Sequence, residues 1–253
     1  MTLVSRQFFL NRSKMINFLI DMAATGDDTA RSLYLPYGLP PPEVAHSLEK
    51  AGNLAIDAAE IIKHATESKT GASLFWGPAV KCLVIPPFPI RQQFILEGYA
   101  AETLISLLKH DFIVALVLVR LGSYAVGVYH GENRVSSKVG TGLVHGRHKK
   151  GGTSQHRFQR HREKQLESFL ERVCLHAQEQ LEPQHKSLDY LVYGGAWTTI
   201  LSLQKRCPFL RQFDNRTLPP LLDISDPRQI VLEKAIGRVW SSSIIQWQDN
   251  EIA

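Results

Sequence analysis

The amino-acid sequence predicts an α/β fold in its second half, preceded by a smaller α+β region. Residues 112–119 form a continuous apolar run, which is typical of a strand buried on both faces. Residues 155–181 carry apolar side chains at helical spacing, and residues 188–193 form another strand, which ends in a glycine pair before a further helix. Strands and helices therefore alternate along the chain, as they do in α/β domains.

The amino-terminal region is expected to cover residues 1–90. Its junction with the next domain is placed at the proline-rich residues 86–89, because proline ends both helices and sheet pairing. The predicted elements are a helix over residues 6–24, a strand over 32–37, a helix over 42–66 and two strands within 71–85.

The second domain is expected to cover residues 91–253. Asp226 and Pro227 are typical of a helix start, with a capping side chain followed by proline at the first helical position. The predicted strands are residues 93–96, 112–119, 124–129, 134–139 and 188–193, and the predicted helices are 100–109, 155–181, one from 197 and one from 226 to about 240.

Composition narrows the class of protein. With 253 residues the chain can bury a core, and no apolar run reaches the roughly 18 residues needed to cross a membrane. The cysteines, Cys82, Cys174 and Cys207, are far apart and odd in number. They predict neither a metal site nor a disulfide framework, and we therefore expect a cytoplasmic protein.

Residues 144–164 are the most strongly charged part of the sequence. They contain seven lysines or arginines and four histidines, with no acid before Glu163. Gly151 and Gly152 lie in the middle, and glycine lets a bulky ligand approach the main chain closely. A basic segment of this kind suits a phosphate backbone. The alternative is an ordinary solvated basic loop.

The helix predicted after this segment has two unlike sides. Its apolar residues, such as Phe169 and Val173, lie opposite a basic stripe that begins at Arg157. One side is therefore expected to pack on the sheet, and the other to face a nucleic acid. The predicted RNA-binding residues are Arg147, His148, Lys149, Lys150, Arg157, Arg160, His161 and Lys164.

Residues 150–162, KGGTSQHRFQRHR, resemble the central domain of the eukaryotic and archaeal class-1 peptide-chain release factors. In those proteins a Gly-Gly-Gln loop runs into a helix that opens with Arg-Phe. Residues 112–131, 190–195 and 222–225 are similar to neighbouring parts of that domain. The resemblance implies a mixed β-sheet flanked by helices, with a glycine-rich basic loop over residues 140–155.

One departure points to a particular branch of the family. With Arg157 and Phe158 aligned, the position of the release-factor glutamine holds Thr153, and the glutamine lies two residues later as Gln155. A Gly-Thr-x-Gln loop resembles the release-factor-like peptidyl-tRNA hydrolases of ribosome quality control, the VLRF type. The resemblance implies that Gly152, Thr153, Ser154 and Gln155 are catalytic. It implies as partners peptidyl-tRNA and the large-subunit ribosomal RNA, with no membrane.

The implied reaction is hydrolysis at the 3′ end of peptidyl-tRNA, which releases a stalled nascent chain. A glutamine amide does not titrate at neutral pH, but it can orient a water and hydrogen-bond a developing charge. No metal-ligand motif is present, and neither a metal nor a cofactor is expected. Two alternatives stay open, a tRNA 3′-end endonuclease and a non-catalytic ribosome- or RNA-binding module. The sequence identifies no recruiting protein.

Overall fold

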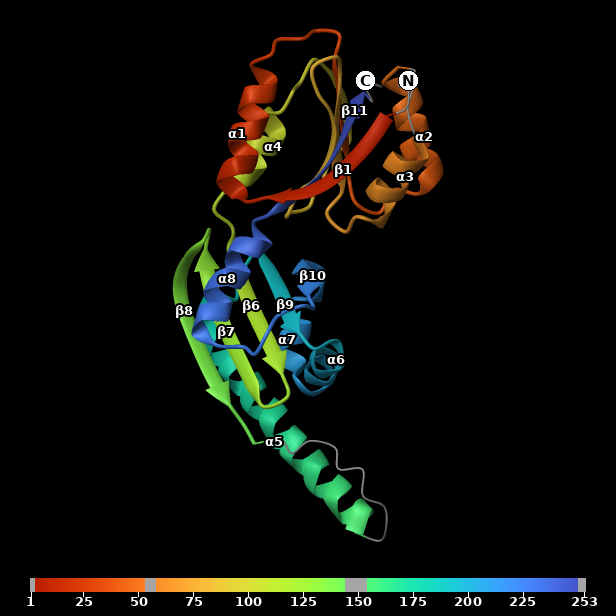
Figure 1. The fold of residues 1–253 in the computed structure, drawn as a ribbon. Coiled ribbons are helices and arrows are strands. Elements are labelled where there is room, and N and C mark those ends of the chain that lie inside the picture. The colour runs from red at the N-terminus through yellow and green to blue at the C-terminus, as the bar shows by residue number, and fades with distance from the viewer. Residues whose placement is uncertain (1–2, 53–57, 144–153, 250–253) are drawn as a thin grey trace. The chain divides into compact units, whose positions relative to one another are not determined.

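The computed structural model describes residues 3–52, 58–143 and 154–249 (Figure 1). The chain divides into two compact units, the first made of Met1–His110 with Gly237–Ala253 and the second of Asp111–Ile236. This division differs from the boundary expected near residue 90. Phe88, in the proline-rich stretch, packs against Trp240 inside the first unit, with ring centroids 4.6 Å apart. The carboxyl terminus returns to the first unit, which is therefore no shorter than the second.

The first unit contains an antiparallel sheet with helices on both faces. Its strands are β1 (Leu3–Leu10), β2 (Arg31–Leu35), β3 (Ala72–Trp76), β4 (Lys81–Ile85), β5 (Phe94–Glu97) and β11 (Ser242–Asp249). They pair in the order β1-β11-β4-β3-β2-β5. Helices α1 (Arg12–Ala23) and α4 (Glu102–Lys109) cover one face, and α2 (Pro41–Lys50) and α3 (Ala58–Glu67) cover the other.

One prediction for this unit was wrong, and one strand was missed. Residues 6–10 belong to strand β1, and the helix begins only at Arg12, after the Asn11 side chain accepts a hydrogen bond from the Lys14 amide at 3.0 Å. Strand β11 was not predicted. Ile244 belongs to the core under α1 and α4, and Ile245 to the core under α2 and α3, because successive strand residues point to opposite faces.

The second unit contains a mixed sheet, as expected. Its strands are β6 (Ile113–Arg120), β7 (Ser123–His130), β8 (Asn133–Thr141), β9 (Tyr190–Gly195) and β10 (Thr217–Leu221). They pair in the order β10-β9-β6-β7-β8, in which β10, β9 and β6 are parallel and β7 and β8 are antiparallel to their neighbours. The apolar run predicted as a doubly buried strand is central strand β6.

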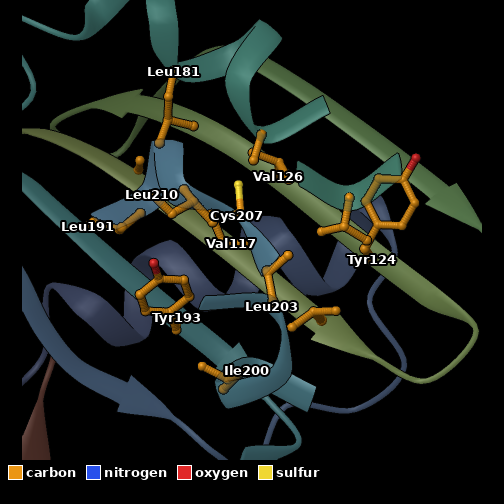
Figure 2. Packing of buried hydrophobic residues seen from close by; sticks show 14 of the residues in the cluster. Val117, Tyr124, Val126, Leu181, Leu191, Tyr193, Ile200, Leu203, Cys207 and Leu210 are labelled. Carbon is orange, nitrogen blue, oxygen red and sulfur yellow. The ribbon is translucent and has the colours of Figure 1, made fainter. Parts of the chain in front are cut away.

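Helices cover both faces of this sheet. On one face lie α5 (Ser154–Leu181), α6 (Trp197–Arg206) and α7 (Pro208–Arg211), with short 3-10 turns at Glu182–Gln184 and Asp214–Arg216. Their apolar residues and those of the sheet form one core, part of which Figure 2 shows. Helix α8 (Gln229–Val239) packs on the other face, where Leu232 lies 2.8 Å from the Cβ position of Gly127.

Helix α8 begins later than the sequence predicted. The carbonyl of Arg228 accepts the first helical hydrogen bonds, from the amides of Val231 and Leu232, each at 3.0 Å. The carboxylate of Asp226 instead accepts a hydrogen bond from the Ser123 hydroxyl on the sheet. A tertiary partner therefore takes the side chain that the sequence pattern assigns to the helix cap.

The cysteine prediction was also wrong. Cys174 on α5 and Cys207 at the start of α7 form a disulfide across a sequence separation of 33 residues, and Cys82 is free and buried. Nothing in the cysteine spacing shows that α5 packs beside α6 and α7, and this packing is what brings the two sulfurs together. A cytoplasmic location remains a prediction.

A search of the described helices for a membrane span gave a negative result. None of them combines sufficient length with sufficient apolar character.

We expect Gly140→Ala to destabilise the second unit. A Cβ at this position in β8 would lie 2.2 Å from the buried Tyr124 hydroxyl, and such overpacking lowers the free energy of unfolding by about 1–3 kcal/mol. Gly237→Ala in α8 is the matched control, because no heavy atom lies within 4 Å of its Cβ position. Urea unfolding measures both. Wild-type stability of Gly140→Ala would show that the Tyr124 side chain does not lie so close to the β8 backbone.

Candidate functional site

Helix α5 consists of an anchored part and a projecting part. From Leu166 onward its apolar side packs on the sheet, where Phe169, Leu170, Val173, Ala177 and Leu181 are buried. Residues 154–165, which we call the helical arm, bury none of their described side chains. At 1.5 Å per residue the arm is about 18 Å long. Figure 1 shows it extending past the end of the second unit's sheet.

The base of the arm is held by the end of β8. The Cβ position of Gly142 lies 2.6 Å from the Phe169 ring, so that only glycine allows this approach. The Arg172 guanidinium donates a hydrogen bond to the Thr141 carbonyl at 3.1 Å. Glycines read from the sequence as loop residues therefore include positions where β8 lies directly against α5.

Tyr124 fixes the same region from the sheet side. Its hydroxyl hydrogen-bonds with Nδ1 of His176 on α5, and its ring contacts the Phe169 ring edge-on, at a centroid distance of 5.9 Å. Burial raises the pKa of Tyr124, and the hydroxyl stays protonated at neutral pH. Its role here is to orient the helix.

The predicted loop over residues 140–155 is shorter in the structure. Gly140 and Thr141 belong to strand β8, and Ser154 and Gln155 form the first residues of α5. The remaining predicted loop residues lie partly outside the described residues, in the gap 144–153.

The predicted catalytic and loop residues fall largely in that gap. Gly152 and Thr153 lie outside the described residues, and for Ser154 and Gln155 the structure describes only the backbone at the helix start. Their catalytic roles remain predictions. Four of the predicted RNA-binding residues also lie outside the described residues. They are Arg147, His148, Lys149 and Lys150.

The other four predicted RNA-binding residues lie together on the arm. Arg157, Arg160, His161 and Lys164 are all exposed. His161, Arg160 and Lys164 follow Arg157 by four, three and seven residues, which places all four on one side of the helix, opposite the apolar side that packs on the sheet. We call these four residues the basic stripe.

Little negative charge offsets this side. The arm contains four lysines or arginines and a single acid, Glu163, which accepts a hydrogen bond from the Gln159 amide at 3.0 Å. Within the described part of the chain, no carboxylate pairs with Arg157, Arg160 or Lys164. The amide groups at a helix amino terminus add partial positive charge. We therefore expect the arm to bind anions.

The charge pattern changes where the arm meets the sheet. Glu167 pairs with Arg206 of α6 at 2.6 Å, and both side chains are about half exposed. The first acid after the arm is thus neutralised within the second unit and does not offset the stripe.

The described residues offer little conventional catalytic chemistry. Burial raises the pKa of Tyr129 and of Tyr193 to about 12, and neither hydroxyl is a base at neutral pH. Among the described residues no group of histidine, cysteine and acidic side chains is arranged to hold a metal. The absence of a cofactor remains a prediction.

The sequence predicted the basic stripe on α5, but it did not predict the contacts that hold α5 on the sheet. Gly142 lies against Phe169 of α5, Gly140 lies against Tyr124, which hydrogen-bonds to α5, and a disulfide joins Cys174 of α5 to Cys207. Glycines inside a strand pattern are a usable signal, since they often mark a close approach of the backbone. No comparable signal marks the disulfide.

The sequence matches one protein-family model, described as the Actinobacteria/chloroflexi VLRF1 release factor, over residues 113–245. This match runs from β6 into β11 and covers more than half of the chain, including the basic arm. A comparison with curated proteins gave no match.

Several solved structures are distantly similar. The archaeal translation termination factor aRF1 is 16% identical, with a TM-score of 0.39 over 91% of this chain and 73% of its own. The Vms1 mitochondrial localization core is 14% identical, with a TM-score of 0.43 over 78% and 87%. Pelota from Archaeoglobus fulgidus is 10% identical, with a TM-score of 0.26 over 92% and 63%. These values are too low to establish a relationship on their own.

We expect the basic stripe to bind nucleic acid through phosphates. Replacing Arg157, Arg160 and Lys164 together by alanine should weaken tRNA binding, and each lost phosphate contact should flatten the slope of log affinity against log salt by roughly 0.7–0.9. Alanine is the strongest helix former, so α5 should persist. Filter binding across a salt series measures both effects.

The control replaces three exposed lysines elsewhere in the second unit, Lys138, Lys186 and Lys234. It removes the same positive charge without changing the arm, and it should flatten the slope of log tRNA affinity against log salt less than the arm variant does. Equal slopes for the two triple variants would show that the stripe is not the binding surface.

Proposed function

The chain belongs to the VLRF1 release-factor family of Actinobacteria and chloroflexi, and on this basis we propose that it hydrolyses the 3′ end of peptidyl-tRNA on the large ribosomal subunit. The family is the one that residues 150–162 resemble, and that prediction is confirmed. The proposed outcome of the reaction is release of a stalled nascent chain. The observation that carries the proposal is the helical arm, on which exposed Arg157, Arg160 and Lys164 have no acidic partner among the described residues.

The arm suits a narrow site lined by RNA. An α-helix with its side chains is about 10–12 Å wide, and none of the described side chains of the arm is buried. Its stripe of Arg157, Arg160 and Lys164 would neutralise phosphates on either side of such a site. Phosphate contacts do not depend on base sequence, which is appropriate for an enzyme that must accept many different tRNAs.

The proposed chemistry lies at the amino-terminal end of the arm. In ester hydrolysis a water oxygen attacks the carbonyl carbon of the peptidyl ester, and the bond from that carbon to the ribose oxygen breaks. A proton passes to the ribose oxygen, and the peptide leaves as a carboxylic acid. Gln155 would orient the water through its amide, and free amide groups at the helix start would stabilise the oxyanion.

A tRNA 3′-end endonuclease would leave a different product. Attack of a ribose 2′-hydroxyl on the adjacent phosphate breaks the nucleic-acid chain, and the peptide stays attached to the released fragment. Mapping the 3′ end of the product tRNA separates the two reactions. An intact CCA end means ester hydrolysis, and a shortened end means phosphodiester cleavage.

We expect Gln155→Ala to impair catalysis without impairing binding. Loss of one preorganised hydrogen-bond donor slows a reaction by on the order of a hundredfold. Since the arm's cations supply the phosphate contacts, affinity for large subunits should be nearly unchanged. A substitution by alanine at a helix start should also leave the free energy of unfolding within about 0.5 kcal/mol. Nascent-chain release from isolated large subunits measures the rate.

Gln159→Ala is the matched control, since Gln159 is an exposed glutamine one turn along the same helix. It should release at nearly the wild-type rate. Full activity of Gln155→Ala would remove the glutamine from the mechanism. Binding by the wild type without any release would favour the non-catalytic module.

A further inference from the structure

At one end of the second unit's sheet, a terminus of each of the five strands lies next to a terminus of its neighbour. Val119 of β6 pairs with Gly195 of β9, and Leu221 of β10 pairs with the neighbouring Gly194. Ser123 of β7 pairs with Arg120 on one side and with Thr141 of β8 on the other. The termini therefore lie in one row, which at about 4.8 Å per strand interval is roughly 19 Å long.

Large apolar side chains follow these termini and are exposed. They are between 46% and 74% accessible to solvent. We call the set the apolar fringe, and it consists of Leu121 after β6, Leu143 after β8, Trp197 after β9 and Leu222 after β10.

Backbone hydrogen bonds hold the connections that carry the fringe. The Ala196 amide donates to the Val119 carbonyl at 3.2 Å, and the Gly142 amide donates to the Gly122 carbonyl at 2.9 Å. Gly195 has φ of +108°, and a Cβ there would lie 2.2 Å from the Val119 carbonyl oxygen. The turn that leads to Trp197 is therefore fixed by a position that only glycine fills.

Charged groups beside the fringe are already engaged. The Arg120 guanidinium donates to the Ile224 carbonyl at 2.7 Å. Asp226 accepts from Ser123 and lies 3.6 Å from the Arg228 guanidinium. The fringe thus differs from the arm, where three cations have no described acidic partner.

This chemistry suits a protein surface better than RNA. Unpaired bases stack on aromatic rings or guanidinium planes, but three of the four fringe residues are leucines. A central apolar cluster that contains a tryptophan and has a polar rim is typical of a protein–protein interface. Exposed apolar patches on soluble domains often mark such sites.

We propose that the apolar fringe docks on an apolar surface of a large-subunit ribosomal protein, an inference that rests on the proposed function. The arm leaves the second unit at the same edge of the sheet (Figure 1). Gly142 touches Phe169, and from Phe169 to the arm's first residue is about 22 Å along the helix. A large ribosomal subunit that binds the arm would therefore also lie close to the apolar fringe.

The test combines Trp197→Ala with Leu222→Ser. Binding to purified large subunits should weaken about tenfold, with an unchanged salt slope, because apolar contacts rather than phosphate contacts are lost. Affinity for free tRNA and the Tm should stay at wild-type values, since both side chains are about half exposed. The control combines Ile230→Ser with Val135→Ser, which are equally exposed in the same unit. It should bind as the wild type does.

A photo-crosslinker at Leu222, used on purified large subunits, identifies the occupant. We expect an adduct that survives ribonuclease treatment and contains a ribosomal protein. An adduct with RNA, or equal loss of affinity for free tRNA, would overturn the protein partner. If the fringe variant binds subunits normally while the wild type still releases nascent chains, the fringe proposal fails and the proposed function stands. If the wild type does not bind large subunits at all, both fail.

Discussion

The burial of the second half of α5 determines what the first half can do. Phe169, Val173 and Leu181 lock the helix onto the sheet, and the disulfide from Cys174 to Cys207 ties it to α7. Because an α-helix is stiff over this length, fixing one half also fixes the direction of the other half. The arm therefore keeps its charge outside the core, and exposed Arg157, Arg160 and Lys164 stay available to a ligand.

Charge and apolar surface are separated along the second unit. On the arm, Arg157, Arg160 and Lys164 have no described acidic partner, whereas at its base Glu167 already pairs with Arg206. At the sheet edge, charged groups are engaged locally and leucines are exposed. Two surfaces of different chemistry thus lie at the same end of the unit. This arrangement fits a protein that meets RNA with the arm and protein with the fringe.

The sequence predicted elements that have one clear signal and missed those that depend on tertiary context. Strand β6 and helix α5 were visible because each has an unambiguous apolar pattern. Strand β10 contains Pro219 and Pro220, which sheets accept only at an edge such as this one. Strand β11 joins a sheet formed by residues far earlier in the chain. The basic stripe was predicted correctly as an exposed face of α5, but the glycine contacts and the disulfide that support it require the packed structure.

The central claim is that the arm reaches the 3′ end of peptidyl-tRNA. Tethered hydroxyl-radical probing tests it with a single labelled cysteine in place of exposed Glu163 on the arm, and a reference probe in place of exposed Ile230 on α8. Specific labelling is feasible because Cys82 is buried and the other two cysteines are bonded to each other. On large subunits that carry peptidyl-tRNA, the account predicts strand cleavage at the tRNA 3′ end from the arm probe and not from the reference probe. Equal cleavage from both probes, or none near the 3′ end, would contradict it.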